Sequence, residues 1–118
     1  MNPLALFAGL VGFFAVALGA FGAHGLDGRL SAEAHGWWET ATFYALTHAV
    51  AALALSLNDL PPLRRAGWAF VLGTVIFGGS LYAMALGAPR WFGMITPLGG
   101  LSLLAGWALV IITGLRKR

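Results

Sequence analysis

The chain has 118 residues, of which 59% are hydrophobic and only 9% are charged. A soluble domain usually carries about 25% charged residues, so this composition excludes an ordinary soluble fold. The formal net charge of +3 comes from basic residues beside apolar runs, which does not indicate a nucleic-acid partner, and the absence of cysteine excludes disulfides and thiolate catalysis.

Four apolar runs follow one another, and each is long enough for a helix that crosses about 30 Å of hydrocarbon. They cover about residues 4–25, 37–58, 66–88 and 91–114. The links between them are short, which places consecutive helices side by side and antiparallel. We therefore predict an all-α integral membrane protein in which residues 1–118 form a single domain, a compact antiparallel four-transmembrane-helix bundle with short loops.

The first run could instead be a secretory signal peptide, because Ala20 and Gly22 offer small residues for cleavage. It has no basic segment ahead of it, however, and its apolar stretch is longer than that of a signal peptide. We expect this run to be a retained span.

A polar stretch, GAFGAHGLDGRLSAEAHGWW, separates the first two runs. We interpret it as a solvated connection at the outer surface, with Ser31 as the N-cap of the second helix. His24, His35 and Glu39 are weak candidates for a metal site, since a third histidine, His48, lies about 15 Å deeper along the second helix. The spacing of the polar residues fits neither a catalytic triad nor a phosphate loop, so we expect no enzyme, metal or cofactor.

His48 is the most informative residue of the second run. It follows Trp38 by about ten residues, or roughly 15 Å, which places it near the midplane of a bilayer. An ionisable group at that depth could carry protons or contact a ligand, and a neutral histidine could equally form a hydrogen bond between helices, so both interpretations stay open. The intramembrane polar or ligand cluster that we predict comprises His48, Tyr44, Ser80, Thr96 and Ser102.

Small residues recur at helical spacing in three of the runs. Lipid is as apolar as leucine, so close approach of small residues, and not the hydrophobic effect, holds membrane helices together. Pro97, followed by two glycines, is expected to bend or loosen the start of the fourth helix. Contacts within one subunit and between subunits both fit this pattern, and we predict helix packing at Gly12, Gly19, Ala23, Gly78, Gly99 and Gly106.

Basic residues predict the orientation, because they concentrate on the cytoplasmic side of membrane proteins. If the chain has four spans, Arg29 and Arg90 are the only basic residues (lysine or arginine) on the outer side. Both termini are therefore expected to be cytoplasmic. Tryptophans fall near the predicted span ends, as is usual at membrane interfaces, except for Trp107. The side shared by the termini carries Arg64, Arg65, Arg116, Lys117 and Arg118.

Four segments carry a family resemblance: GAFGAH at 19–24, YALTH at 44–48, GTVIFGGSLY at 73–82 and TPLGGLSLLAGWAL at 96–109. Together they resemble the YgdD/YwdK-like family of small bacterial inner-membrane proteins, described as domain of unknown function 423 and related to the eukaryotic transmembrane protein 256 group. The chain differs at Ala45, where glutamine is common in that family. The resemblance implies a four-span protein of unknown biochemical role.

The sequence thus predicts a small polytopic protein of the bacterial inner membrane, with a structural or interaction role and no catalytic activity. The expected surroundings are the lipid bilayer, and the chain is expected to associate with itself as a homo-oligomer. The alternative function is that of a small transporter or proton-conducting protein that uses His48.

Overall fold

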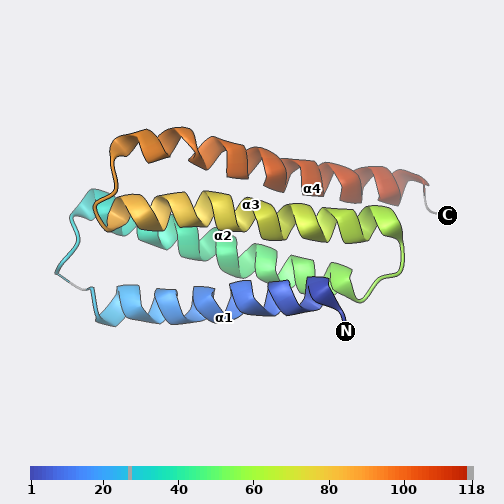
Figure 1. Ribbon diagram of the computed structural model, residues 1–118, viewed down its shortest axis with the longest axis horizontal. Coiled ribbons are helices and arrows are strands. Elements are labelled where there is room, and N and C mark those ends of the chain that lie inside the picture. The colour runs from blue at the N-terminus through green and yellow to red at the C-terminus, as the bar shows by residue number, and fades with distance from the viewer. Residues whose placement is uncertain (27, 117–118) are drawn as a thin grey trace.

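The computed structural model describes residues 1–26 and 28–116, and within them the chain forms helices and no strand. The four α-helices lie lengthwise beside one another with alternating direction, so that the N-terminus and the end of α4 are at the same end (Figure 1). A short 3-10 helix, η1, precedes the last of them. The elements are α1 (Pro3–His24), α2 (Ala32–Ser56), α3 (Pro61–Ala85), η1 (Arg90–Met94) and α4 (Thr96–Arg116).

Local capping explains where the helices begin. The side chain of Asn2 accepts a hydrogen bond from the Ala5 N–H at 3.2 Å, which caps α1. Ser31 caps α2 through the Ala34 N–H at 3.1 Å, so this predicted N-cap is confirmed. The cap at Ser31 starts α2 at Ala32, several residues before the predicted apolar run. The first turn of the helix is polar, so an apolar run could not reveal it. Pro61 opens α3, where a missing N–H breaks no helical bond.

The start of the fourth apolar run is irregular. Residues 90–94 form η1, and a regular α-helix begins only at Thr96. Pro97 therefore lies in the first turn of α4, where proline is well tolerated, and it does not bend the helix from within. The irregular stretch lies just before the proline, at the start of the run where loosening was expected.

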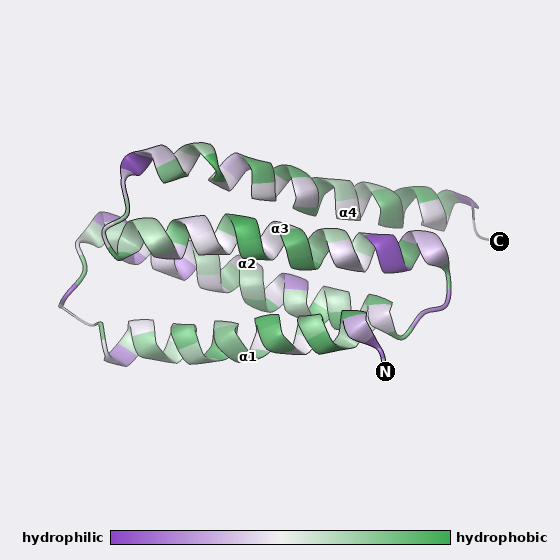
Figure 2. Ribbon diagram, in the orientation of Figure 1, coloured by the Kyte–Doolittle hydropathy of each residue, from purple (hydrophilic) through white to green (hydrophobic). Residues whose placement is uncertain are grey.

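Length and composition identify the chain as a membrane protein. Within residues 1–26 and 28–116, three helical stretches are long and apolar enough to span a bilayer: Pro3–His24, Pro61–Ala85 and Arg90–Arg116. Large apolar side chains point outward, including Phe13 at 70% exposure and Leu104 at 66%. Hydrophobic residues occur along the whole length of α1 (Figure 2). Such a surface is unsuited to water and suited to hydrocarbon.

Small side chains fill much of the interior. α3 packs against α1, α2 and α4, whereas α1 and α4, on opposite sides of the α2–α3 pair in Figure 1, make no contact within the described residues. Small buried side chains let the backbones of adjacent helices approach closely. The buried alanines are Ala8, Ala15, Ala34, Ala41, Ala45, Ala49, Ala52, Ala66 and Ala85.

The glycines and alanine predicted for helix packing occupy different environments. A Cβ atom added at Gly19 would lie 2.9 Å from the Thr42 methyl group, and one at Gly12 would lie 3.6 Å from the Ala49 Cβ, so both face α2. Ala23 is exposed, and its neighbour Gly22 packs on the ring of Trp38 instead.

On α3, a Cβ atom at Gly78 would meet the Ala41 carbonyl of α2 at an ordinary 3.8 Å. The approach is much closer between α3 and α4. A Cβ atom at Gly99 would lie 2.8 Å from the Gly73 carbonyl oxygen, and one at Gly106 would lie 3.1 Å from the Ala66 carbonyl oxygen. Real Cβ atoms do not approach backbone atoms as closely as 2.8 Å, so the α3–α4 interface depends on the absence of a side chain at Gly99.

Candidate functional site

His48 lies inside the helical assembly and uses both of its ring nitrogens. Its side chain is only 7% exposed. Nδ1 is 2.9 Å from the carbonyl oxygen of Tyr44, one turn earlier on α2. On the other edge of the ring, the Trp107 Nε1–H of α4 donates to Nε2 at 3.0 Å. His48 therefore joins α2 to α4, two helices that are far apart in the sequence.

These two hydrogen bonds fix the tautomer of His48. The indole N–H is a donor without acceptor capacity, so Nε2 must carry a free lone pair. The Tyr44 carbonyl can only accept, so Nδ1 must carry the proton. The observed geometry fits a neutral imidazole protonated at Nδ1. A proton added at Nε2 would displace the Trp107 N–H.

Aromatic rings surround His48. Phe70 of α3 makes an edge-on contact with it, with ring centroids 5.1 Å apart, and Phe70 also packs against Trp107 at 4.7 Å. The ring of Tyr44 stacks on His48 at 5.9 Å. The rings supply contact area on several sides of His48, and a neutral imidazole packs well among them.

A groove of about 490 Å³ opens beside His48 between α2, α3 and α4. Of its described lining residues, only Tyr44, His48 and Trp107 carry polar side-chain atoms; the others are aliphatic, aromatic, proline or glycine. His48 therefore borders a mainly apolar space. The described lining of the groove does not contain a chain of groups that could pass protons to or from His48.

The other members of the predicted polar cluster lie apart from His48. Ser80 of α3 and Thr96 of α4 form a hydrogen bond of 2.5 Å, and Ser80 also donates to the Phe77 carbonyl at 2.9 Å. Ser102 donates to the Ala69 carbonyl at 2.8 Å. The predicted set thus divides into three separate contacts, each of which connects α4 to α2 or to α3.

Trp107 was not among the predicted site residues, yet it provides the main partner of His48. The sequence did contain one signal, since Trp107 was the tryptophan that did not fit the membrane-interface pattern. A tryptophan in the middle of a span has an N–H that needs an acceptor. In the fold, that acceptor is the Nε2 atom of His48.

The weak metal candidates do not form a site in the described residues, which contain no group of three or more histidine or acidic side chains that could hold an ion. His35 and Glu39 line one groove between α1 and α2, of about 290 Å³, and His24 is not part of its lining. The neighbouring acid Asp27 lies outside the described residues.

A polar network ties three helix ends together at the basic end. Arg64 donates to the Ser56 carbonyl at 2.8 Å and to the Asn2 side-chain oxygen at 3.2 Å. Asn2 in turn donates to the same Ser56 carbonyl at 2.9 Å. The last carbonyl of α2 is thereby satisfied by a cation, which also complements the helix dipole.

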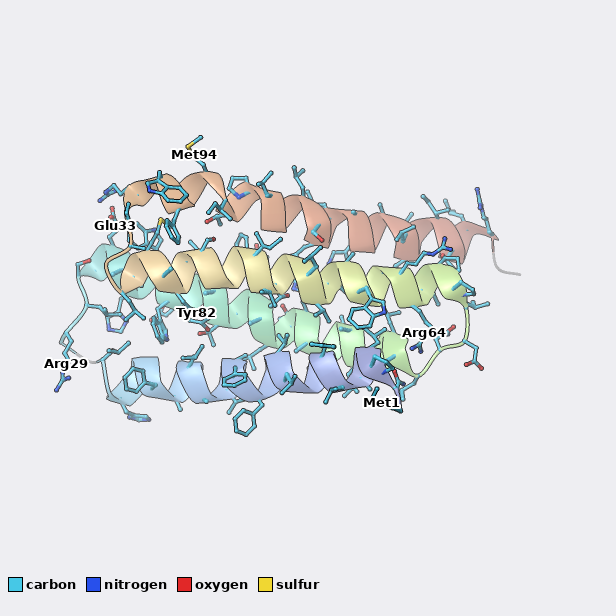
Figure 3. All side chains as sticks on the ribbon, in the orientation of Figure 1. Met1, Arg29, Glu33, Arg64, Tyr82 and Met94 are labelled. Carbon is cyan, nitrogen blue, oxygen red and sulfur yellow. The ribbon has the colours of Figure 1, made fainter. Side chains whose placement is uncertain are left out.

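The opposite end has a surface contact. Arg90 forms an exposed 2.6 Å ion pair with Glu33 and lies 5.7 Å from the ring centroid of Trp37. In Figure 3, Arg64 lies at the same end as Met1, whereas Arg29 and Glu33 lie at the opposite end.

The fold and the site define a helical membrane protein whose buried polar groups connect helices to one another. Residues 18–100 match the family described as protein of unknown function, DUF423. The UPF0382 inner membrane protein YgdD of Escherichia coli K12 is 42% identical over 96% of this chain and 89% of its own length. Relatives named UPF0382 membrane proteins in Staphylococcus epidermidis and Staphylococcus haemolyticus are each 39% identical, over 98% and 96% of the chain and over 98% and 95% of their own lengths.

The chain therefore belongs to the DUF423 family, a family of membrane proteins of unknown function. This confirms the family resemblance carried by the four sequence segments. No solved structure matches the chain.

Proposed function

We propose that the chain is a non-catalytic four-span protein of the inner membrane, in which the His48–Trp107 hydrogen bond is a structural link between α2 and α4. The observation that carries this proposal is the occupation of both His48 nitrogens by fixed partners. A group committed to two hydrogen bonds stabilises a fold more readily than it shuttles protons, because each proton transfer must break one of them.

Connectivity supports a membrane crossing by α2, although this helix is not one of the three described stretches whose length and composition suit a membrane span. The helix has 25 residues, about 37 Å at 1.5 Å per residue, which exceeds the hydrocarbon thickness. It packs against α1 and α3, and it runs between the end of α1 and the beginning of α3, at opposite ends of the molecule in Figure 1. If α1 and α3 both span the bilayer, α2 must return the chain through it.

Both termini are proposed to be cytoplasmic, because Arg64, Arg65 and Arg116 share one end of the helices. In a bacterial host, a reporter fused at the C-terminus should behave as cytoplasmic, and one inserted next to Gly28 should behave as external. The paired use of a cytoplasmic-active and an export-active reporter at each position controls for poor expression. The orientation is wrong if both positions give the reverse pattern.

Self-association is a further part of the proposal. It is supported by Gly9, where α1 has open space beside its backbone, and by an adjoining apolar groove of about 530 Å³ that includes Gly12 and Ala17. Such a smooth surface permits close approach of another helix. Sedimentation of the detergent-solubilised chain tests this, and a mass of one chain at all concentrations would contradict it.

Substitutions at His48 test the structural role. His48→Gln should keep most of the stability, because an amide can both accept from Trp107 and donate to the Tyr44 carbonyl. His48→Leu should lower the free energy of unfolding by about 1–3 kcal/mol, since it leaves the Trp107 N–H without its acceptor beside a mainly apolar groove. Thermal unfolding in detergent measures the difference. Equal stability of both variants would show that the hydrogen bonds do not support the fold.

Proton conduction is the second candidate, favoured by the position of His48 on an open groove. Proton flux into liposomes that contain the chain distinguishes conduction from a structural role. The flux is measured under a pH gradient between about pH 5 and 8, the range in which histidine most readily changes charge. We expect no flux above that of empty liposomes. Clear flux that His48→Gln removes without unfolding the protein would replace the structural proposal with the conducting one.

A further inference from the structure

A groove of about 420 Å³ lies between the beginning of α3 and the end of α4. Two arginines line it from different helices, Arg65 in the second turn of α3 and Arg116 in the last turn of α4. The rest of the lining is mainly apolar and includes Leu60, Leu109 and Ile112. The groove therefore combines two cations with a hydrocarbon-like wall.

Neither arginine is neutralised within the described part of the chain. The single ion pair among residues 1–26 and 28–116 joins Arg90 to Glu33, and no hydrogen bond from Arg65 or Arg116 to another residue is present there. The adjacent Arg64 is different, because its guanidinium is committed to Ser56, Asn58 and Asn2. Arg65 and Arg116 are both exposed, and each guanidinium carries about five N–H donors that can bind a ligand in the groove.

An anion bound by both arginines would neutralise two positive charges that line the same groove. A guanidinium presents a planar pair of donors that matches two oxygens of a phosphate, and this recognition is stronger than a neutral hydrogen bond. The hydroxyl of Thr113, also in the lining, already donates to the Leu109 carbonyl at 2.7 Å. The arginines therefore provide the polar recognition, and the leucine and isoleucine side chains provide an apolar surface.

We propose that this groove binds an anionic phospholipid, with its phosphate between Arg65 and Arg116 and an acyl chain along Leu109 and Ile112. The inference rests on the proposed topology, in which this end of the helices lies at the cytoplasmic surface of the membrane. Charge complementarity selects the anionic headgroup, and the apolar wall selects a lipid over a free phosphate. Basic pockets between helices at that surface are suited to such headgroups.

The test uses the full-length chain in a neutral detergent, with dioleoylphosphatidylglycerol and dioleoylphosphatidylcholine as probes and native mass spectrometry as the readout. The wild-type chain should bind phosphatidylglycerol at least about fivefold more tightly than phosphatidylcholine. Arg65→Gln and Arg116→Gln should each weaken phosphatidylglycerol binding about fivefold, and the double variant about 25-fold, as expected for roughly 1 kcal/mol per basic residue at a membrane surface.

A matched control removes two charges at the other end. Arg29→Gln combined with Arg90→Gln gives the same net charge as the double groove variant, and it should leave phosphatidylglycerol binding within about twofold of wild type. Equal losses in both double variants would overturn the proposal, because they would indicate attraction to overall charge. Absence of a headgroup preference in the wild-type chain would also overturn it, and this result does not depend on the folding of any variant.

Glycerol phosphate tests the source of the phosphate. A millimolar concentration should not displace the lipid, because it lacks the acyl chain, and displacement would contradict a lipid site. Reporter fusions address the topology independently. If the chain shows no lipid preference while the reporter fusions give the expected pattern, only the lipid site is rejected. If the fusions give the reverse pattern, the proposed orientation is rejected.

Discussion

Replacing Gly99 with alanine is expected to destabilise the protein by about 2–3 kcal/mol, at the upper end of the usual cost of overpacking. The added methyl group would overlap the Phe77 backbone nitrogen and lie 2.8 Å from the Gly73 carbonyl oxygen. Both are main-chain atoms of α3, so no side-chain rotation can make room, and α4 must move away. Unfolding of the purified chain in detergent, followed by helical circular dichroism, measures the change.

The neighbouring glycine provides the control for this substitution. A Cβ atom at Gly100 would meet only the ring of Phe77, at an ordinary 3.9 Å. Gly100→Ala should therefore be neutral or slightly stabilising, because alanine favours a helix by up to about 1 kcal/mol over glycine. Equal destabilisation by both alanines would mean that helix propensity or the start of α4 controls stability. Equal tolerance of both would mean that the two helices are further apart than described.

Movement of α4 would also affect the site. The link between His48 and Trp107 needs α4 at its present distance, and so does the hydrogen bond between Ser80 and Thr96. Because each of these contacts joins α4 to α2 or α3, their loss should accompany the backbone shift. The close approach at Gly99 is therefore a condition for the buried polar contacts as well as for packing.

Much of the helical arrangement could be predicted from the sequence. Long apolar runs, short links and Ser31 located the helices, because these signals act within one segment. The irregular start of the last run was predicted only in part. Pro97 indicated an irregularity near the start of this run. The sequence did not predict that residues 90–94 would form the separate helix η1.

The partners of the polar residues could not be predicted in the same way. In a helix that is apolar on most faces, hydrophobic periodicity does not fix its rotation, so the direction of each side chain stays undetermined. His48 was recognised by its depth, but its contact with Trp107 also requires the relative rotation and axial offset of α2 and α4. Ser102 shows the same difficulty, because its acceptor is the Ala69 carbonyl, a backbone group with no residue-specific signal.

The second large effect is expected from Trp38→Ala, which should destabilise the protein by about 3–5 kcal/mol, the usual cost of truncating a buried tryptophan. Trp38 is only 3% exposed, and its Nε1–H donates to the Leu18 carbonyl at 2.8 Å. Its ring lies edge-on to Tyr82, with centroids 4.5 Å apart. The substitution would therefore open a cavity where α1, α2 and α3 meet. Unfolding in detergent gives the loss of free energy.

Trp91 is the matched control for Trp38, because it is a tryptophan near the same end of the molecule and is 59% exposed. Trp91→Ala should change the free energy of unfolding by no more than about 0.5 kcal/mol, as is usual for surface substitutions.

Trp38→Phe separates ring packing from hydrogen bonding, since it keeps an aromatic ring and removes the donor. It should cost only about 1 kcal/mol, the typical net contribution of one hydrogen bond. If Trp38→Phe were as damaging as Trp38→Ala, the bond to Leu18 would outweigh ring packing. If Trp91→Ala were as damaging as Trp38→Ala, burial would not explain either result.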